Sequence, residues 1–191
     1  MAGGFLGKRS LAGIAGIVAA ATLLSKVFGL LRESASAAAF GTGPVVDAYN
    51  ISYVVPGFLL ILLGGINGPF HSAIVSAVSK RKREEIAPIV ETVTTLVGIA
   101  TVALTIAIIV FAAPIIDLFG PGFQLTEVGM QSRAIAITQL RIMAPITIFA
   151  CLIGIGFGTL NADDQYWLPS ISPLLSSSAV IVGLGVLWLA V

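Results

Sequence analysis

Apolar residues dominate five long stretches of this chain, and short polar segments separate them. The stretches cover residues 11–39, 46–78, 86–113, 134–160 and 167–191. A bilayer core about 30 Å thick needs about 20 apolar residues in a helix, because lipid offers no partner for a free backbone N–H or C=O group. The pattern therefore predicts an all-α integral membrane protein with about five transmembrane helices.

The second stretch, residues 46–78, is too long for one straight crossing of the membrane. As a continuous helix it would extend about 50 Å, well beyond one bilayer core. A break is expected in its middle, where glycine and proline weaken the helix at Gly64, Gly65, Gly68 and Pro69.

Basic residues indicate whether this break makes one bent span or two short spans. Lys8 and Arg9 precede the first stretch, and Lys80–Arg83 follow the second. Positively charged segments stay on the cytoplasmic side, so an even number of crossings must lie between the two basic clusters. One bent span is therefore predicted, with the N-terminus in the cytoplasm and residues 114–131 outside.

Composition supports a membrane location and excludes several classes of function. Of the 191 residues, 57% are hydrophobic and 10% are charged, and the net charge is +1. A soluble domain could not cover so much apolar surface, and so few bases argue against nucleic-acid binding. The sequence contains no phosphate-binding loop, metalloprotease motif or nucleophile–base pair, and Cys151 is a lone cysteine. No enzyme activity, cofactor or metal site is expected.

Two bases lie in the first stretch, where lipid is expected. Lys26 is about 22 Å along the helix from Leu11, and Arg32 is about 9 Å further. A base near the bilayer centre costs at least about 2.5 kcal/mol on insertion scales, so it normally faces a bundle interior or a watery cavity. Both bases are candidates for binding an anionic ligand, and the alternative for each is snorkelling to the outer interface. They lie about 120° apart on an ideal helix, so they share one cavity only if the helix bends, which Gly29 permits.

Two carboxylates are candidate partners for these bases. Asp47 begins the second helix, where it either caps free N–H groups or pairs with Lys26 or Arg32 across a short hairpin. Glu33 shares a helix face with Lys26, two turns away. The sequence leaves the choice between these pairings open.

Further along the chain, Arg141 is the other charged candidate. It lies about 12 Å beyond Arg133 in the fourth stretch, and its expected partner is Asp117 or Glu127 on the outer side. A structural tie and a substrate contact are both open for Arg141. His71 is interpreted as a packed polar residue rather than a proton relay, since a lone helical histidine is more often packed.

Several motifs occur in a recognisable order along nearly the whole chain. They are residues 23–33 (LLSKVFGLLRE), 39–41 (AFG), 46–49 (VDAY), 120–123 (GPGF), 140–145 (LRIMAP), 158–161 (GTLN) and Leu168-Pro169 with Pro173. This ordered set resembles the MurJ/MviN family of lipid II flippases.

The resemblance implies a bacterial inner-membrane transporter of the multidrug/oligosaccharidyl-lipid/polysaccharide exporter superfamily, in which two six-helix lobes surround a central cavity. Residues 1–191 would be part of the N-terminal lobe. The implied cargo is lipid II or a similar polyprenyl diphosphate lipid, and the implied partners are membrane lipids and a C-terminal lobe or partner chains. Bases at the positions of Lys26 and Arg32 hold the diphosphate in that family, and an Asp matching Asp47 is also important.

Two features depart from the family pattern. Lys26 replaces the usual arginine, which keeps the charge and loses the bidentate fork. After Pro56, this chain has Leu60-Ile61 and Gly64-Gly65 where the family commonly carries paired arginines and then Glu-Gly. Because an expected phosphate-binding arginine is missing here, a different cargo is an alternative, either another polyprenyl-linked glycan or a drug. A third interpretation is a non-transporting helical subunit of a larger membrane complex. Because Val191 falls inside the fifth stretch, a fragment of a longer protein is expected.

Overall fold

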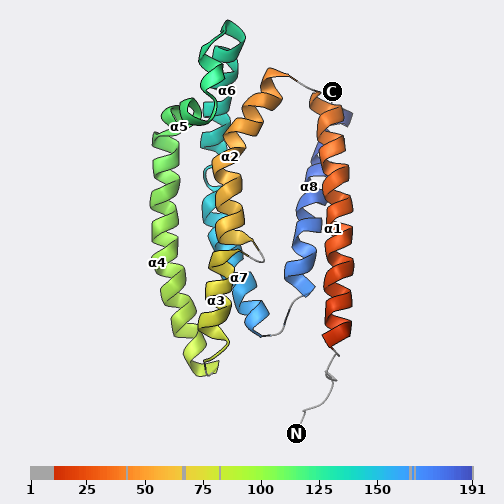
Figure 1. The fold of residues 1–191 in the computed structure, drawn as a ribbon, viewed down its shortest axis with the longest axis vertical. Coiled ribbons are helices and arrows are strands. Elements are labelled where there is room, and N and C mark those ends of the chain that lie inside the picture. Colours follow the sequence, from red (N-terminus) through yellow and green to blue (C-terminus); the bar gives the residue numbers. More distant parts are fainter. Residues whose placement is uncertain are drawn as a thin grey trace. The chain divides into compact units, whose positions relative to one another are not determined.

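The computed structural model describes residues 11–41, 43–65, 68–81, 83–163, 165 and 167–190, and these residues form helices joined by short turns. The helices in chain order are α1 (Leu11–Phe40), α2 (Pro44–Gly64), α3 (Pro69–Val78), α4 (Arg83–Val110), α5 (Ala112–Phe119), the 3₁₀ helix η1 (Pro121–Gln124), α6 (Glu127–Met143), α7 (Ile146–Ala162) and α8 (Trp167–Ala190). Figure 1 shows this all-helical fold, which confirms the predicted fold class.

The chain divides into two compact units. One contains α1 and α8, and the other, Phe40–Asp163, contains α2 to α7. In the first unit, the Ser25 hydroxyl on α1 donates to the Ser170 carbonyl on α8 at 3.4 Å. Of the basic residues used to orient the chain, Lys8, Arg9 and Lys82 lie outside the described residues.

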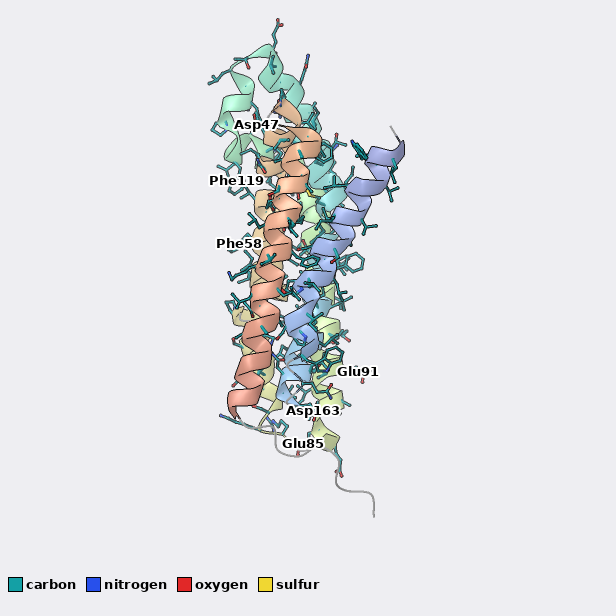
Figure 2. All side chains as sticks on the ribbon, turned by 90° about the vertical axis from the view of Figure 1, so that its right-hand side faces the viewer. Asp47, Phe58, Glu85, Glu91, Phe119 and Asp163 are labelled. Atoms are coloured by element: carbon teal, nitrogen blue, oxygen red, sulfur yellow. The ribbon has the colours of Figure 1, made fainter. Side chains whose placement is uncertain are left out.

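The larger unit makes three passes in alternating directions. α2 and α3 run the same way, α4 returns, and α6 followed by α7 makes the third pass (Figure 1). The third pass is central, since α6 contacts α2 and α7 contacts α2, α3 and α4. Asp47 and Phe119 lie toward one end of this unit, and Glu85 and Asp163 lie toward the other (Figure 2).

The second predicted span breaks at the expected glycines. α2 ends at Gly64, and α3 begins at Pro69 after an extended Gly68 with φ −70° and ψ 159°. A Cβ atom on Gly68 would lie 2.6 Å from the Ile61 carbonyl oxygen, so glycine is required in this turn. Together the two helices form one candidate span, Pro44–Val78.

Small residues on one face of α7 allow the break between α2 and α3 to approach α7 closely. Ala150, Gly154 and Gly158 recur every four residues and are buried. A Cβ atom on Gly154 would lie 1.8 Å from the Leu63 carbonyl oxygen, and one on Gly158 would lie 2.6 Å from Ile74 Cγ2. Close approach over small residues is a common way for helices to associate in lipid, where burial from water supplies no driving force. The glycines of α7 therefore leave the space in which the bent span packs against this helix.

Two clusters of buried apolar side chains fill the larger unit. The first joins α2 to α4, α5 and α6 through Ala48, Leu59, Ile108, Ala112, Ile116, Ala136, Leu140 and Ala144. The second joins α3 to α7 through Ile74, Val78, Cys151 and Ile155. Cys151 is thus a packing residue, 1% exposed within the second cluster.

The predicted fourth span differs most from the structure. It was expected over residues 134–160, but α6 begins at Glu127 because the Thr126 side chain accepts a hydrogen bond from Gly129 N at 3.0 Å and caps the helix. The span is also broken between α6 and α7 at Ala144-Pro145. Pro145 has no N–H group to continue the helical hydrogen-bond ladder, which accounts for the break.

Four segments of the described chain are long and apolar enough to cross a membrane. They are Pro44–Val78, Glu84–Val110, Glu127–Ala162 and Trp167–Leu189. These segments correspond to the second, third, fourth and fifth predicted stretches. The crossing by α1 stays a prediction.

Candidate functional site

Lys26 lies near the middle of α1 and its side chain is exposed. At 1.5 Å per residue, it is about 22 Å from Leu11 and about 21 Å from Phe40. Leu23, Val27 and Leu30 around it are also exposed. No salt bridge to Lys26 is found within the described part of the chain. The structure thus presents the Lys26 ammonium among exposed apolar side chains near the middle of α1.

Arg32 lies on a different face of α1. Arg32 and Ser25, seven residues apart on one face of α1, are both partly buried. The Arg32 guanidinium forms an ion pair with the Glu33 carboxylate. The structure therefore pairs Arg32 with Glu33. Because the Arg32 and Glu33 side chains are 38% and 68% exposed, this pair contributes little to stability.

Asp47 lies in the first turn of α2 but does not cap it. The N-cap residue is Gly43, and no side-chain hydrogen bond caps the helix. The capping alternative for Asp47 is therefore wrong. A carboxylate in the first turn still interacts favourably with the helix dipole. Its exposed side chain makes no salt bridge within the residues that the structure describes.

Asp47 lines an open surface cavity of about 380 Å³ in the larger unit. Asp47 and Asn50 come from α2, and Phe119 comes from the end of α5. Figure 2 shows Asp47 and Phe119 toward the same end of the unit. The full lining is Asp47, Asn50, Ile51, Phe119, Gly120, Pro121, Gly122 and Phe123. Within the described part of the chain, this lining holds one carboxylate and one amide among apolar groups and contains no base.

The turn between α5 and η1 fixes the cavity wall. Gly120 is buried, and a Cβ atom there would lie 2.9 Å from Phe123 Cδ2 and 3.2 Å from Ile51 Cγ2. Phe123 N also donates to Gly120 O at 3.0 Å. The Phe123 ring therefore rests directly over Gly120 and packs with Ile51 against the core. The GPGF motif thus has a local structural explanation.

The expected partner of Arg141 is corrected by the structure. Asp117 on α5 instead receives two hydrogen bonds from Arg133 on α6, Nε to Oδ1 at 2.5 Å and Nη2 to Oδ2 at 2.8 Å. Arg141 lies eight residues further along α6, about 12 Å away, and its Nε donates to the Ile109 carbonyl at 3.3 Å. The estimated depth of each residue in the membrane had suggested Arg141 as the partner of Asp117, but the partner is Arg133. The forked Arg133–Asp117 pair ties α5 to α6.

We expect the Arg133–Asp117 ion pair to lower the pH at which the Asp117 carboxyl group titrates. Hydrogen bonds from Arg133 lower the pKa of Asp117 to about 2. Because the folded pKa lies below the ordinary value of 3.8, any stabilisation from the pair is present above about pH 4 and is lost as the pH falls toward 2. Carbon-13 NMR of the carboxyl group should show this, and Arg133→Gln should return the pKa toward 4. A pKa near 4 in the unsubstituted protein would contradict the pairing.

His71 and Asn161 form a second polar contact between helices. His71 on α3 is 6% exposed, and its Nε2 lies 2.9 Å from Asn161 Nδ2 on α7. The amide donates to the imidazole in this arrangement, which requires the proton on Nδ1. Asn161 Oδ1 is buried and has no hydrogen-bond partner among the residues that the structure describes. His71 is thus a packed polar residue, as the sequence predicted.

The structure brings together only part of the predicted set. Asp47 belongs to the larger unit, whereas Lys26, Arg32 and Glu33 belong to α1 in the other unit. Asn50 was not predicted, although its position three residues after Asp47 puts both on one face of α2. No group of three or more His, Cys, Asp or Glu side chains that could hold a metal ion is found among the described residues.

Long apolar helical segments, one of them bent between α2 and α3, define a multi-pass helical membrane protein. The sequence model described as "Lipid II flippase MurJ" matches residues 36–189. The chain belongs to the lipid II flippase MurJ family. No solved structure matches it.

Curated relatives agree with this family. A Synechocystis protein named "Probable lipid II flippase MurJ" is 65% identical over 178 residues, covering 93% of this chain and 32% of the relative. The "Lipid II flippase MurJ" of Thermosipho africanus is 30% identical over 163 residues, covering 85% of this chain and 33% of the relative. A Rhizobium meliloti relative is 32% identical over 182 residues, covering 90% of this chain and 32% of its own length. The chain thus spans about a third of the length of these relatives.

Proposed function

We infer that this chain takes part in moving lipid II, or a closely similar polyprenyl diphosphate lipid, from the cytoplasmic to the outer leaflet. The diphosphate and its sugar would enter a basic cavity that opens alternately to each side, while the lipid tail stays in the bilayer. No covalent step is required for this exchange. Family membership supports the proposal, and the chain spans about a third of the relatives that carry the name.

The observation that carries the proposal is the position of Lys26. An exposed ammonium halfway along an apolar helix is costly in lipid, so it needs water or an anion beside it. Phosphate is an anion that lysine and arginine commonly hold. We assign Lys26 and Arg32 as phosphate-binding bases, with Glu33 holding Arg32 when no substrate is present. Asp47 belongs to the same substrate path, and Arg141 has a structural role on α6.

The proposal includes an orientation in the bacterial inner membrane. With the N-terminus in the cytoplasm, Lys80 and Arg81 lie on the cytoplasmic side, and the turns at Gly43 and at residues 120–126 lie outside. Asp47 and Phe119 at one end of the larger unit and Glu85 at the other are consistent with this arrangement (Figure 2).

Cysteine labelling tests this orientation directly. A cysteine placed at Gly43 should react with a membrane-impermeant maleimide from the outside of intact cells. The native Cys151 is 1% exposed and should give little background, and a cysteine at Lys80 should label only after the inner membrane is opened. Labelling at Gly43 from the cytoplasmic side alone would contradict the orientation.

A second cargo in the same superfamily is favoured by one observation. In α2, Leu60 and Ile61 stand where the family commonly carries arginines, and Ile61 is 69% exposed. The site therefore offers fewer bases to a diphosphate than the family pattern does. Another polyprenyl-linked glycan is the alternative cargo.

A chimera tests the function in cells. This chain would replace the matching third of the Synechocystis relative, and the chimera would be expressed in bacteria depleted of their own lipid II flippase. Growth equal to that given by the unaltered relative is the expected result. Lysis on depletion, at equal protein levels in the membrane, would contradict the proposal for lipid II.

A further inference from the structure

The cavity beside Asp47 is chemically unsuited to the diphosphate. Among the described residues, its lining contains the Asp47 carboxylate and no base. A carboxylate repels a phosphate group at short range and accepts hydrogen bonds only. The Asp47 carboxylate therefore suits a ligand group that donates hydrogen bonds and carries no negative charge.

The remaining lining narrows the class of ligand. Asn50 adds one acceptor and an NH₂ donor beside the carboxylate, which suits adjacent hydroxyl groups. The faces of the Phe119 and Phe123 rings carry partial negative charge, which favours contact with the polarised C–H groups of a pyranose ring. A small cation could bind the Asp47 carboxylate and the Asn50 amide oxygen, but it would leave the aromatic side chains and most of the 380 Å³ unused.

The cavity is shaped by the fold before any ligand binds. Phe123 is fixed against Ile51 and over Gly120, and Asp47 and Asn50 are one turn apart on α2. A few positioned polar groups on a largely apolar, preformed wall are the usual features of a site for a small polar ring.

We propose that the cavity lined by Asp47, Asn50, Phe119 and Phe123 is a binding site for a neutral sugar ring. This inference depends on the proposed function only in naming the headgroup sugar of the cargo as the physiological ligand. Recognition of the cargo is then divided, with bases on α1 holding the diphosphate and this cavity holding the sugar.

Binding is measured without translocation, so a negative result here stays separate from failure of the flippase proposal. The chain would be held in phospholipid nanodiscs, because detergents with sugar headgroups would compete. The probes are methyl glycosides of glucose, mannose and N-acetylglucosamine, followed by saturation-transfer NMR. We expect at least one glycoside to bind with a dissociation constant on the order of 1–10 mM.

Two variants test the site by independent means. Asp47→Asn removes the charge with little change in shape, and it should weaken binding about tenfold. Gly122→Leu adds bulk to the lining where a new Cβ would have no atom within 4 Å, so it should block binding without disturbing the fold. Glu127→Gln removes an exposed carboxylate outside the cavity and should leave binding unchanged.

The competing outcomes are distinct. Binding of ethylammonium that depends on Asp47, with no glycoside binding, would make this a cation site and overturn the proposal. Competition by inorganic diphosphate would also overturn it, because the lining should reject anions. Absence of glycoside binding, or binding unchanged by both Asp47→Asn and Gly122→Leu, would overturn it as well.

Discussion

Replacing Lys26 with alanine should abolish complementation by the chimera, whereas Lys26→Arg should largely preserve it. Both variants keep a helix-forming residue at this position, so α1 should form in each. Only arginine retains a positive charge at the middle of the helix. Growth of flippase-depleted cells and the amount of chimera in the membrane are measured together.

The matched control is Thr22→Ala, four residues away on the same exposed side of α1. It changes a polar side chain without changing charge and should support normal growth. Full growth with Lys26→Ala at normal protein levels would remove Lys26 from the substrate site. Loss of growth in both Lys26 variants would show that more than the charge is required there.

Gly154→Ala should destabilise the helical bundle far more than its single methyl group suggests. The new Cβ atom would lie 1.8 Å from the Leu63 carbonyl oxygen, so α7 and the end of α2 must separate. Overpacking of this kind costs about 2–3 kcal/mol or more, which corresponds to a fall in Tm of about 5–10 °C. Thermal unfolding in nanodiscs, followed by far-ultraviolet circular dichroism, measures the effect.

Gly156→Ala provides the control on the same helix. A Cβ atom on Gly156 would have no atom within 4 Å, and alanine favours helix over glycine by up to about 1 kcal/mol. Its Tm should therefore be unchanged or slightly higher. Equal effects of Gly154→Ala and Gly156→Ala would contradict the close packing of α7 against the break in α2–α3.

Local chemistry explains which parts of the fold were predictable. The break between α2 and α3 was expected because several helix-weakening residues, Gly64, Gly65, Gly68 and Pro69, lie close together there. The start of α6 was missed because residues 127–133 are polar, and an apolar pattern does not detect a polar helix end. A Thr126 cap was the available signal.

Contacts between distant residues were harder to predict. Asp117 has several arginines within reach along the chain, and only the fold selects Arg133 over Arg141. The spacing of Ala150, Gly154 and Gly158 was readable as a helix-packing motif, but its partner on α2 was not. The cavity at Asp47 also depends on the fold, since the α5–η1 turn that completes it is more than 70 residues away.

Direct transfer of lipid II across a bilayer is the strictest test of the proposed flippase function. The chimera would be reconstituted into liposomes with fluorescent lipid II, and an impermeant quencher would report the fraction that changes leaflet with time. We predict transfer above that of protein-free liposomes, loss of transfer with Lys26→Ala and retention with Lys26→Arg. Transfer at the protein-free rate, in liposomes where the unaltered Synechocystis relative is active, would contradict the account.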